Sequence, residues 1–321
     1  MASLRQIRGR IKSIQSSKQI MRAMQLVSGS KLKRSQDKLI ASREVLGFLD
    51  GLLQRVLAAT ASEYKTTKST YLAKKKGPKP LTHPLSTPKP DGPSALVIIT
   101  SDAGLCGSYN TNLVQMAEAY LRRDAARRAQ LVFIGKRAHR YFTKRGYATL
   151  DAFLDLAGRP NVAKAEQIGR SLIDRFLSGE VSSVSVLYSR FLSATTYKPT
   201  VQPWLPIQLD SSTAPQLVSR DSSPTSRRAD EPPSAVSDYI FEPSPEQVYE
   251  DLLPRWALAK FQLIMLEAFT SEHSARMIAM KNATDNAEEL LGELVQQRNR
   301  IRQATITKEL SEIVGTAEAL K

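Results

Sequence analysis

The distribution of proline constrains the fold of this chain more than any other feature. All 17 prolines lie between Pro78 and Pro254. Proline removes a backbone donor and clashes with the preceding turn, so a long helix needs a stretch without it. The first 77 residues and the last 67 can therefore each form a long uninterrupted helix.

The first segment carries a narrow apolar seam. From Leu4 its apolar residues recur at alternating spacings of three and four, with one polar interruption at Lys18 and with Val27 and Ser28 as alternatives at one position. This spacing is typical of a coiled-coil contact. Continued to Val56, it predicts a helix of about 55 residues, roughly 80 Å long.

The last segment repeats the pattern. Ser244 is a candidate N-cap before Pro245, and an apolar seam runs from Phe261 through Leu290 to Ile313. It predicts a helix of about 70 residues, in which Pro254 produces at most a kink. Since a lone helix cannot hide its apolar stripe, we expect the two terminal helices to pair antiparallel.

The middle of the chain alternates strand and helix patterns. The predicted strands and helices are, in chain order, strand 95–100, helix 112–128, strand 130–135, helix 136–145, helix 161–178 and strand 182–191. This order predicts a small α/β domain with a mainly parallel sheet. The fold class is therefore α/β, with two long terminal helices flanking the domain.

Two compositionally biased stretches interrupt this order and predict mobile loops, at 74–93 and 210–238. We divide the chain into an N-terminal coiled-coil helix (1–60), a Pro/Lys-rich loop insertion (61–93), the α/β domain (94–209), a polar disordered loop (210–243) and a C-terminal coiled-coil helix (244–321).

The stretch "TSDAGLCGSYNTNL", residues 100–113, follows the first predicted strand and resembles a phosphate-binding turn. Gly104 and Gly107 match neither the dinucleotide fingerprint nor the P-loop. Asp102 would place a carboxylate near a phosphate, or it would cap the turn. We favour a tight turn that closes a βα unit, with Cys106 packed beneath it.

Catalytic and metal-binding patterns are weak. Ser101 and Asp102 have no histidine placed by a motif, and three scattered histidines and one cysteine show no ligand spacing. We therefore expect no catalytic residue, no metal and no cofactor.

The chain is strongly basic, with a formal net charge of +15. Residues 1–40 hold ten basic side chains and one acidic one, which indicates an acidic partner. Nucleic acid is one candidate, although residues 1–47 contain no aromatic side chain to stack on bases. A ring of acidic protein loops is another, and an enzyme built on the α/β domain is a third reading.

Both ends and the glycine turn resemble the gamma chain of F-type ATP synthase, the central rotor stalk. The resemblance rests on "IRGRIKSIQSSKQIMRAMQLVSGSKLKRSQ" at 7–36 and on "MKNATDNA" and "RQATITKELSEIV" near the other end. The turn matches the family pattern S-D-R-G-L-C-G-G-L-N, with Ala103 in place of the arginine and Ser108–Tyr109 in place of Gly–Leu.

The resemblance implies a mechanical role. The α/β domain would be Rossmann-like without binding a nucleotide, and the paired helices would turn inside a hexamer of alpha and beta subunits during proton-coupled ATP synthesis or hydrolysis. Other implied partners are the epsilon subunit and the c-ring of Fo, with no nucleic acid. With no transit peptide recognised, we expect peripheral association with a bacterial inner membrane on its cytoplasmic side, through the complex.

The resemblance also implies which residues contact the beta subunits. Carried over position by position, these coupling contacts are Arg22, Met24, Arg276, Arg302, Gln303, Thr307 and Glu309.

Overall fold

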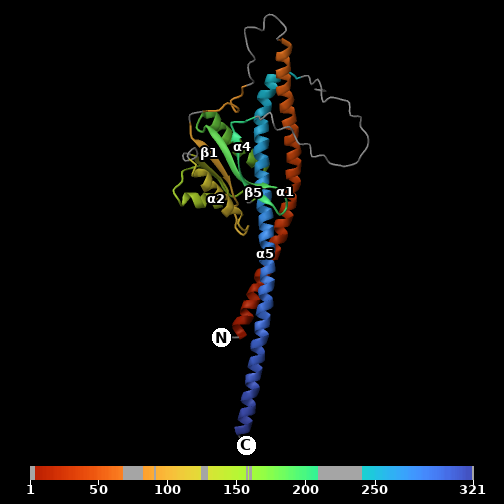
Figure 1. Ribbon diagram of the computed structural model, residues 1–321, viewed down its shortest axis with the longest axis vertical. Helices are drawn as coiled ribbons and strands as arrows, with labels where there is room; N and C mark the ends of the chain where they lie inside the picture. The colour runs from red at the N-terminus through yellow and green to blue at the C-terminus, as the bar shows by residue number, and fades with distance from the viewer. Residues whose placement is uncertain are drawn as a thin grey trace, which may run out of the picture.

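The computed structural model describes residues 4–67, 82–89, 92–123, 129–156, 158, 161–208 and 241–319. The polar stretch 210–238 and residues 74–81 of the proline-rich stretch lie outside these ranges, so the interpretation of both as loops stays a prediction. Figure 1 shows two long helices side by side, with an α/β domain packed against one part of them.

The two long helices are α1 (Leu4–Thr67) and α5 (Pro245–Ala319), and they form the predicted antiparallel pair. Lys18 forms an ion pair with Glu288 at 3.0 Å, whereas Ser35, further along α1, meets Thr270 at 2.7 Å. Partner numbers fall on α5 as they rise on α1, which is the antiparallel sense. Both helices are longer than predicted, and the domain boundaries drawn around them stay predictions.

The coiled-coil seam is largely the predicted one. Of the two alternatives on α1, Ser28 is buried at 3% exposed and Val27 is 55% exposed. On α5, Leu290 was wrongly assigned to the seam, because it is 44% exposed and its neighbour Leu291 packs on α1 instead. A straight helix drifts away from a strict heptad repeat, and this drift moves the contact to the next residue.

A five-stranded sheet forms the centre of the α/β domain. Its order is β3-β2-β1-β4-β5, and all neighbouring strands are parallel except β4 and β5. The strands are β1 (Ser94–Ile99), β2 (Gln130–Ile134), β3 (Thr149–Phe153), β4 (Ser183–Phe191) and β5 (Tyr197–Leu205). The mainly parallel sheet and its three predicted strands are confirmed.

The sequence pattern missed both edge strands of this sheet. β5 contains Pro199 and Pro203, which argue against a strand in the middle of a sheet but are tolerated at an edge. β3 is five residues long, and none of them is fully buried, so it lacks an apolar run. In both cases, position at the sheet edge explains why the sequence signal was weak.

Three helices cover the sheet: α2 (Tyr109–Leu121), α3 (Lys136–Thr143) and α4 (Val162–Ser178). α2 begins three residues earlier than predicted, and residues 124–128 of its predicted range lie outside the described residues. The α4 prediction is confirmed. The Asn161 side chain accepts a hydrogen bond from the Lys164 N–H at its start, and Gly179 ends it in the left-handed conformation.

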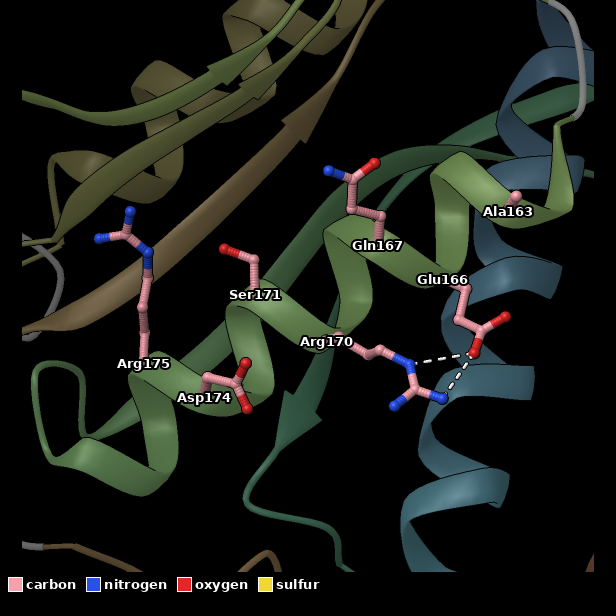
Figure 2. A pocket seen from close by; sticks show the side chains of 7 residues that line it. All are labelled: Ala163, Glu166, Gln167, Arg170, Ser171, Asp174 and Arg175. Atoms are coloured by element: carbon pink, nitrogen blue, oxygen red, sulfur yellow. Dashed lines mark hydrogen bonds and ion pairs between the residues drawn. The ribbon is translucent and has the colours of Figure 1, made fainter.

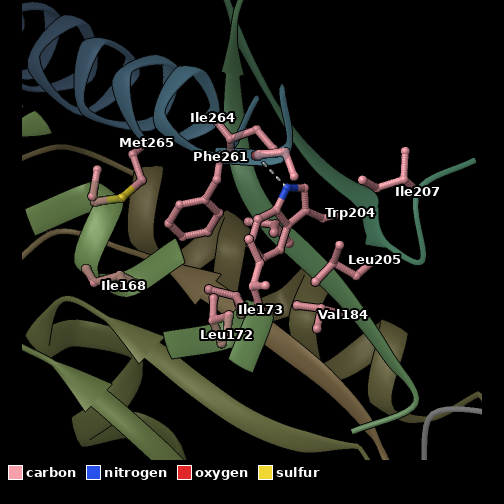
Figure 3. Close-up of a cluster of buried hydrophobic side chains, with 14 of the residues drawn as sticks. Ile168, Leu172, Ile173, Val184, Trp204, Leu205, Ile207, Phe261, Ile264 and Met265 are labelled. Atoms are coloured by element: carbon pink, nitrogen blue, oxygen red, sulfur yellow. Dashed lines mark hydrogen bonds between the residues drawn. The ribbon is translucent and has the colours of Figure 1, made fainter. Parts of the chain in front are cut away.

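The two faces of the sheet face different neighbours. Leu96 and Ile98 of β1 pack with α2 and α3, whereas Val97 and Ile99 pack in a cluster shared with α4 and the long helices. Figure 3 shows the centre of that second cluster, where Trp204 of β5 lies against Phe261 of α5 with ring centroids 4.8 Å apart. Shaft and domain therefore share one hydrophobic core.

The described part of the proline-rich stretch also packs on the domain. Leu85 is buried, and its carbonyl accepts a hydrogen bond from the Ile207 N–H at 2.8 Å. Lys89 donates to the carbonyls of Phe176 and Leu177 at the end of α4, where a positive charge is favourable. Residues 82–89 thus connect α4 to the end of β5.

Candidate functional site

The glycine turn lies at the carboxyl edge of the sheet, beside the point where the strand order reverses between β1 and β4. Open α/β sheets bind their ligands in this crevice. Here α5 crosses it: the Tyr109 hydroxyl donates to the Ala268 carbonyl at 3.0 Å, and the Arg276 Nε donates to the Gly104 carbonyl at 3.3 Å. The shaft helix occupies the place where a nucleotide lies in dinucleotide-binding proteins.

The polar side chains of the turn stabilise local structure. Asp102 Oδ1 accepts from the Lys136 N–H at 3.1 Å, so of the two alternatives for this carboxylate the structure favours a cap, on the following helix α3. The Ser101 hydroxyl donates to the Ala103 carbonyl, and Cys106 is 2% exposed, as predicted for a residue packed under the turn.

The largest groove among the described residues, about 570 Å³, lies along the outer surface of α4 (Figure 2). All its lining residues come from this one helix, and Glu166 and Arg170 pair with each other at 2.7 Å. Its side chains project side by side instead of converging on one point. It lacks the arrangement of facing groups that a catalytic site needs.

The described part of the chain contains no group of three or more His, Cys, Asp or Glu side chains able to hold a metal ion. In the same residues no helix is long and apolar enough to cross a membrane.

The predicted contact residues of α5 lie at its free end. Arg302, Gln303, Thr307 and Glu309 are all exposed. Figure 1 shows that α5 runs on well past the first residue of α1, so this end stands alone. The structure therefore presents these four side chains to a partner.

The predicted contacts on α1 lie further along the coiled coil. Arg22 is exposed, and Met24 is half-buried in an apolar hollow of about 280 Å³ that Ile20 and Val27 also line. Lys18 already stands opposite Glu288, so Met24 and Arg302 are separated by roughly 30 Å along the shaft. The structure does not bring the two sets into one site.

Arg276 lies in a third place. It is 9% exposed and forms an ion pair at 2.8 Å with Glu272, one turn earlier on α5. Burial raises the pKa of the Glu272 carboxyl above its usual value, and Arg276 opposes this rise. Because Arg276 bonds within the chain, its expected role as a beta-subunit contact stays a prediction.

Comparison with known proteins identifies the family. Residues 3–320 match the family described as ATP synthase. The chain is 38% identical over 323 residues to the ATP synthase gamma chain of Anaeromyxobacter sp. (strain Fw109-5), and 36% identical over 321 residues to that of Moorella thermoacetica. Each comparison covers 100% of both chains. This chain belongs to the ATP synthase gamma-chain family.

Solved structures agree with the gamma-chain fold. One is the central stalk and c-ring of the Tetrahymena thermophila mitochondrial ATP synthase, with a TM-score of 0.52, 22% identity, and coverage of 82% of this chain and 99% of the other. Another comes from the Euglena gracilis mitochondrial ATP synthase, with a TM-score of 0.51, 18% identity, and coverage of 91% and 95%. Both show that the fold is that of a central stalk.

The sequence pattern missed the exposed apolar surface at the tip of this gamma chain. Ile306, Leu310 and Ile313 were assigned to the paired seam, yet they are 48%, 57% and 64% exposed. The periodicity was correct, but α1 has no residues at this level. The signal lay in the lengths of the two helices, because an antiparallel partner that begins near residue 4 cannot reach beyond about residue 302.

Proposed function

We propose that this gamma chain is the central rotor shaft of a proton-translocating F1Fo ATP synthase. It transmits rotation between a ring in the membrane and the hexamer of alpha and beta subunits. As it turns, it drives each beta subunit through its conformations during ATP synthesis or hydrolysis. It has no catalytic site of its own, and its contribution to the reaction is mechanical.

The observation that carries this proposal is the unpaired end of α5. About 15 residues beyond Arg302 form a helix with no neighbour in the chain, and a helix of this length is marginal in water by itself. Its exposed side chains include Ile306, Leu310 and Ile313. Such a helix becomes stable when a partner surrounds it, and the central channel of a hexamer provides such a sleeve.

The charge of α1 supports an acidic partner around the shaft. Arg5, Arg8, Arg10 and Arg22 are exposed, and they lie on the stretch of the coiled coil near its free end. Such a surface attracts acidic loops of beta subunits over long range. Arg22 and Met24 would meet these loops, while Arg302, Gln303, Thr307 and Glu309 would contact beta subunits further along the shaft.

The opposite end of the shaft, with the α/β domain, would face the c-ring of Fo and the epsilon subunit. Through these partners the chain would be held at the cytoplasmic side of a bacterial inner membrane as a peripheral subunit. This placement needs no cofactor and no nucleic acid.

Reconstitution tests this function. The chain is assembled with alpha and beta subunits from the same source on membranes that contain Fo, and ATP hydrolysis and ATP-driven proton pumping are measured. We expect Met24→Lys and Arg302→Ala to assemble, to hydrolyse ATP and to pump severalfold fewer protons per ATP. Leu26→Lys and Arg300→Ala introduce the same changes at nearby exposed positions and should pump like the wild type.

Two results would contradict the proposal. If the wild-type chain neither assembles nor couples hydrolysis to pumping, the rotor function is wrong. Binding to DNA or RNA that weakens steeply with salt would then favour a nucleic-acid-binding coiled coil. If the wild type couples and all four variants behave alike, the rotor stands but the assigned contacts do not.

A further inference from the structure

A continuous stretch of α5 is buried on every side where it crosses the carboxyl edge of the sheet. Every residue from 264 to 276 is buried, although many of them are polar. We call the polar members of this stretch the polar collar: Glu267, Thr270, Ser271, Glu272, His273, Ser274 and Arg276. Burial of so many polar groups on one helix is costly unless each finds a partner.

The collar makes its bonds in several directions around the helix axis. Thr270 meets Ser35 of α1 at 2.7 Å, the Ser271 hydroxyl donates to a carbonyl of β4 at 2.8 Å, and the Ser274 hydroxyl donates to a carbonyl of the loop after β4 at 2.5 Å. Because successive residues are turned by roughly 100°, these bonds leave α5 toward different neighbours.

The remaining bonds of the collar hold two turns of the α/β domain. Arg276 forms its ion pair with Glu272 and donates to the carbonyls of Ala103 and Gly104 in the glycine turn, at 3.4 and 3.3 Å. The His273 Nε2 lies 2.9 Å from the carbonyl of Gly158, in the segment before α4. The collar thus connects α5 to α1, to β4 and to both of these segments.

We propose that the Glu272–Arg276 pair is a positioning element that fixes the rotational setting of the shaft helix against the α/β domain. This inference rests on the proposed rotor function and adds to it the place where torque passes between domain and shaft. Arg276 acts through the glycine turn that it holds, so its role is internal and it is not a contact to a beta subunit.

The physical reason is the difference between apolar and polar contacts. The shared hydrophobic core holds α5 on the domain, but burial of apolar surface is non-directional and tolerates small rotations of a helix. A hydrogen bond weakens steeply when its angle or length changes. Bonds spread around a helix therefore resist its rotation, and the guanidinium of Arg276 reaches two carbonyls and a carboxylate at once.

The first test compares two arginines in the assembled, membrane-bound complex. Arg276→Met removes the bonds between shaft and turn, and we expect it to lower the number of protons pumped per ATP severalfold while ATP hydrolysis continues. Arg175→Met is the matched control. Arg175 pairs with Asp151 and Glu180 inside the α/β domain, so its loss should leave the pumping ratio unchanged.

The second test restores the connection by a covalent bond. A Cβ at Gly107 would lie 3.7 Å from the Cβ of Ala279, which is within the usual range for a disulfide. We therefore combine Arg276→Met with Gly107→Cys and Ala279→Cys, in a background in which Cys106→Ser prevents incorrect pairing. We expect oxidation to restore the pumping ratio and reduction to lower it again in the same molecules.

The outcomes are distinct. If Arg276→Met pumps like the wild type, the inference is wrong. If this variant does not assemble, the oxidised cysteine variant decides: assembly with restored pumping supports the inference, and oxidation without recovery refutes it. A wild-type complex that does not couple at all would instead overturn the proposed rotor function, and this inference with it.

Discussion

Two stretches of the same helix, the polar collar and the free tip of α5, reverse the usual distribution of side chains. The collar at 267–276 is polar and buried, whereas the tip beyond Arg302 is exposed and carries Leu310, Ile313 and Val314. Soluble chains ordinarily place these residue types the other way round.

The difference shows what each stretch contributes. Buried polar groups give a junction whose geometry is specified bond by bond, and they connect the shaft to its domain. Exposed apolar groups give a surface that only a partner can cover. A single helix thus carries a fixed junction at one level and an intermolecular contact at the other.

The largest expected effect is on the collar. Arg276→Met leaves the buried Glu272 carboxylate without its partner, and we expect the free energy of unfolding of the full chain to fall by about 3 kcal/mol. Arg302→Met at the tip should change it by less than about 0.5 kcal/mol. Denaturant unfolding of both variants measures the contrast, and equal losses would remove the distinction between the two stretches.

Stability should also depend on pH through the collar. Burial lowers the pKa of His273 to about 4, below its unfolded value of about 6.5. The folded chain therefore resists protonation. The contribution is complete above about pH 6.5 and is lost as the pH falls toward 4, amounting to roughly 3 kcal/mol.

The test is to compare wild type with His273→Gln, because both keep Glu272, whose raised pKa acts in the opposite direction. Their unfolding free energies should converge or cross as the pH falls from 7 to 4. His139→Gln is the control, on the outer helix α3 away from the collar. Curves that stay parallel for wild type and His273→Gln would contradict the prediction.

A smaller effect is expected for a single hydroxyl. Ser271→Ala leaves the carbonyl of Ser189 in β4 without this donor and should cost about 1 to 2 kcal/mol. Ser311→Ala on the tip should be nearly neutral, because its hydroxyl donates to a carbonyl of its own helix in an exposed position. Thermal unfolding of the two variants provides the measurement, and a larger loss for the tip variant would reverse our interpretation.

The smallest effect on the chain itself is expected for apolar residues of the tip. Leu310→Ser should leave its stability within about 0.5 kcal/mol of the wild type, because the side chain is 57% exposed. Leu266→Ser, next to the collar and 7% exposed, should cost several times more. Binding of the chain to alpha and beta subunits should show the reverse order. Equal binding by both variants would argue against a partner around the tip.

Much of the fold could be predicted from local patterns. The absence of proline from both ends, the seam through Ile7 and Leu39, and the three apolar strands each specify an element by their own sequence. The edge strands β3 and β5 could not be predicted, because edge position tolerates polar residues and proline.

The sequence by itself determined the long helices, their antiparallel pairing, the parallel sheet and, through a family resemblance, the candidate contacts at Met24 and Arg302. Only the tertiary structure decided that α5 occupies the crevice beside the glycine turn, that Arg276 bonds inside the chain, and that the tip is unpaired. The reason is that periodicity reports which face of a helix is apolar, whereas the identity of the neighbour depends on helix lengths and on elements far away in the chain.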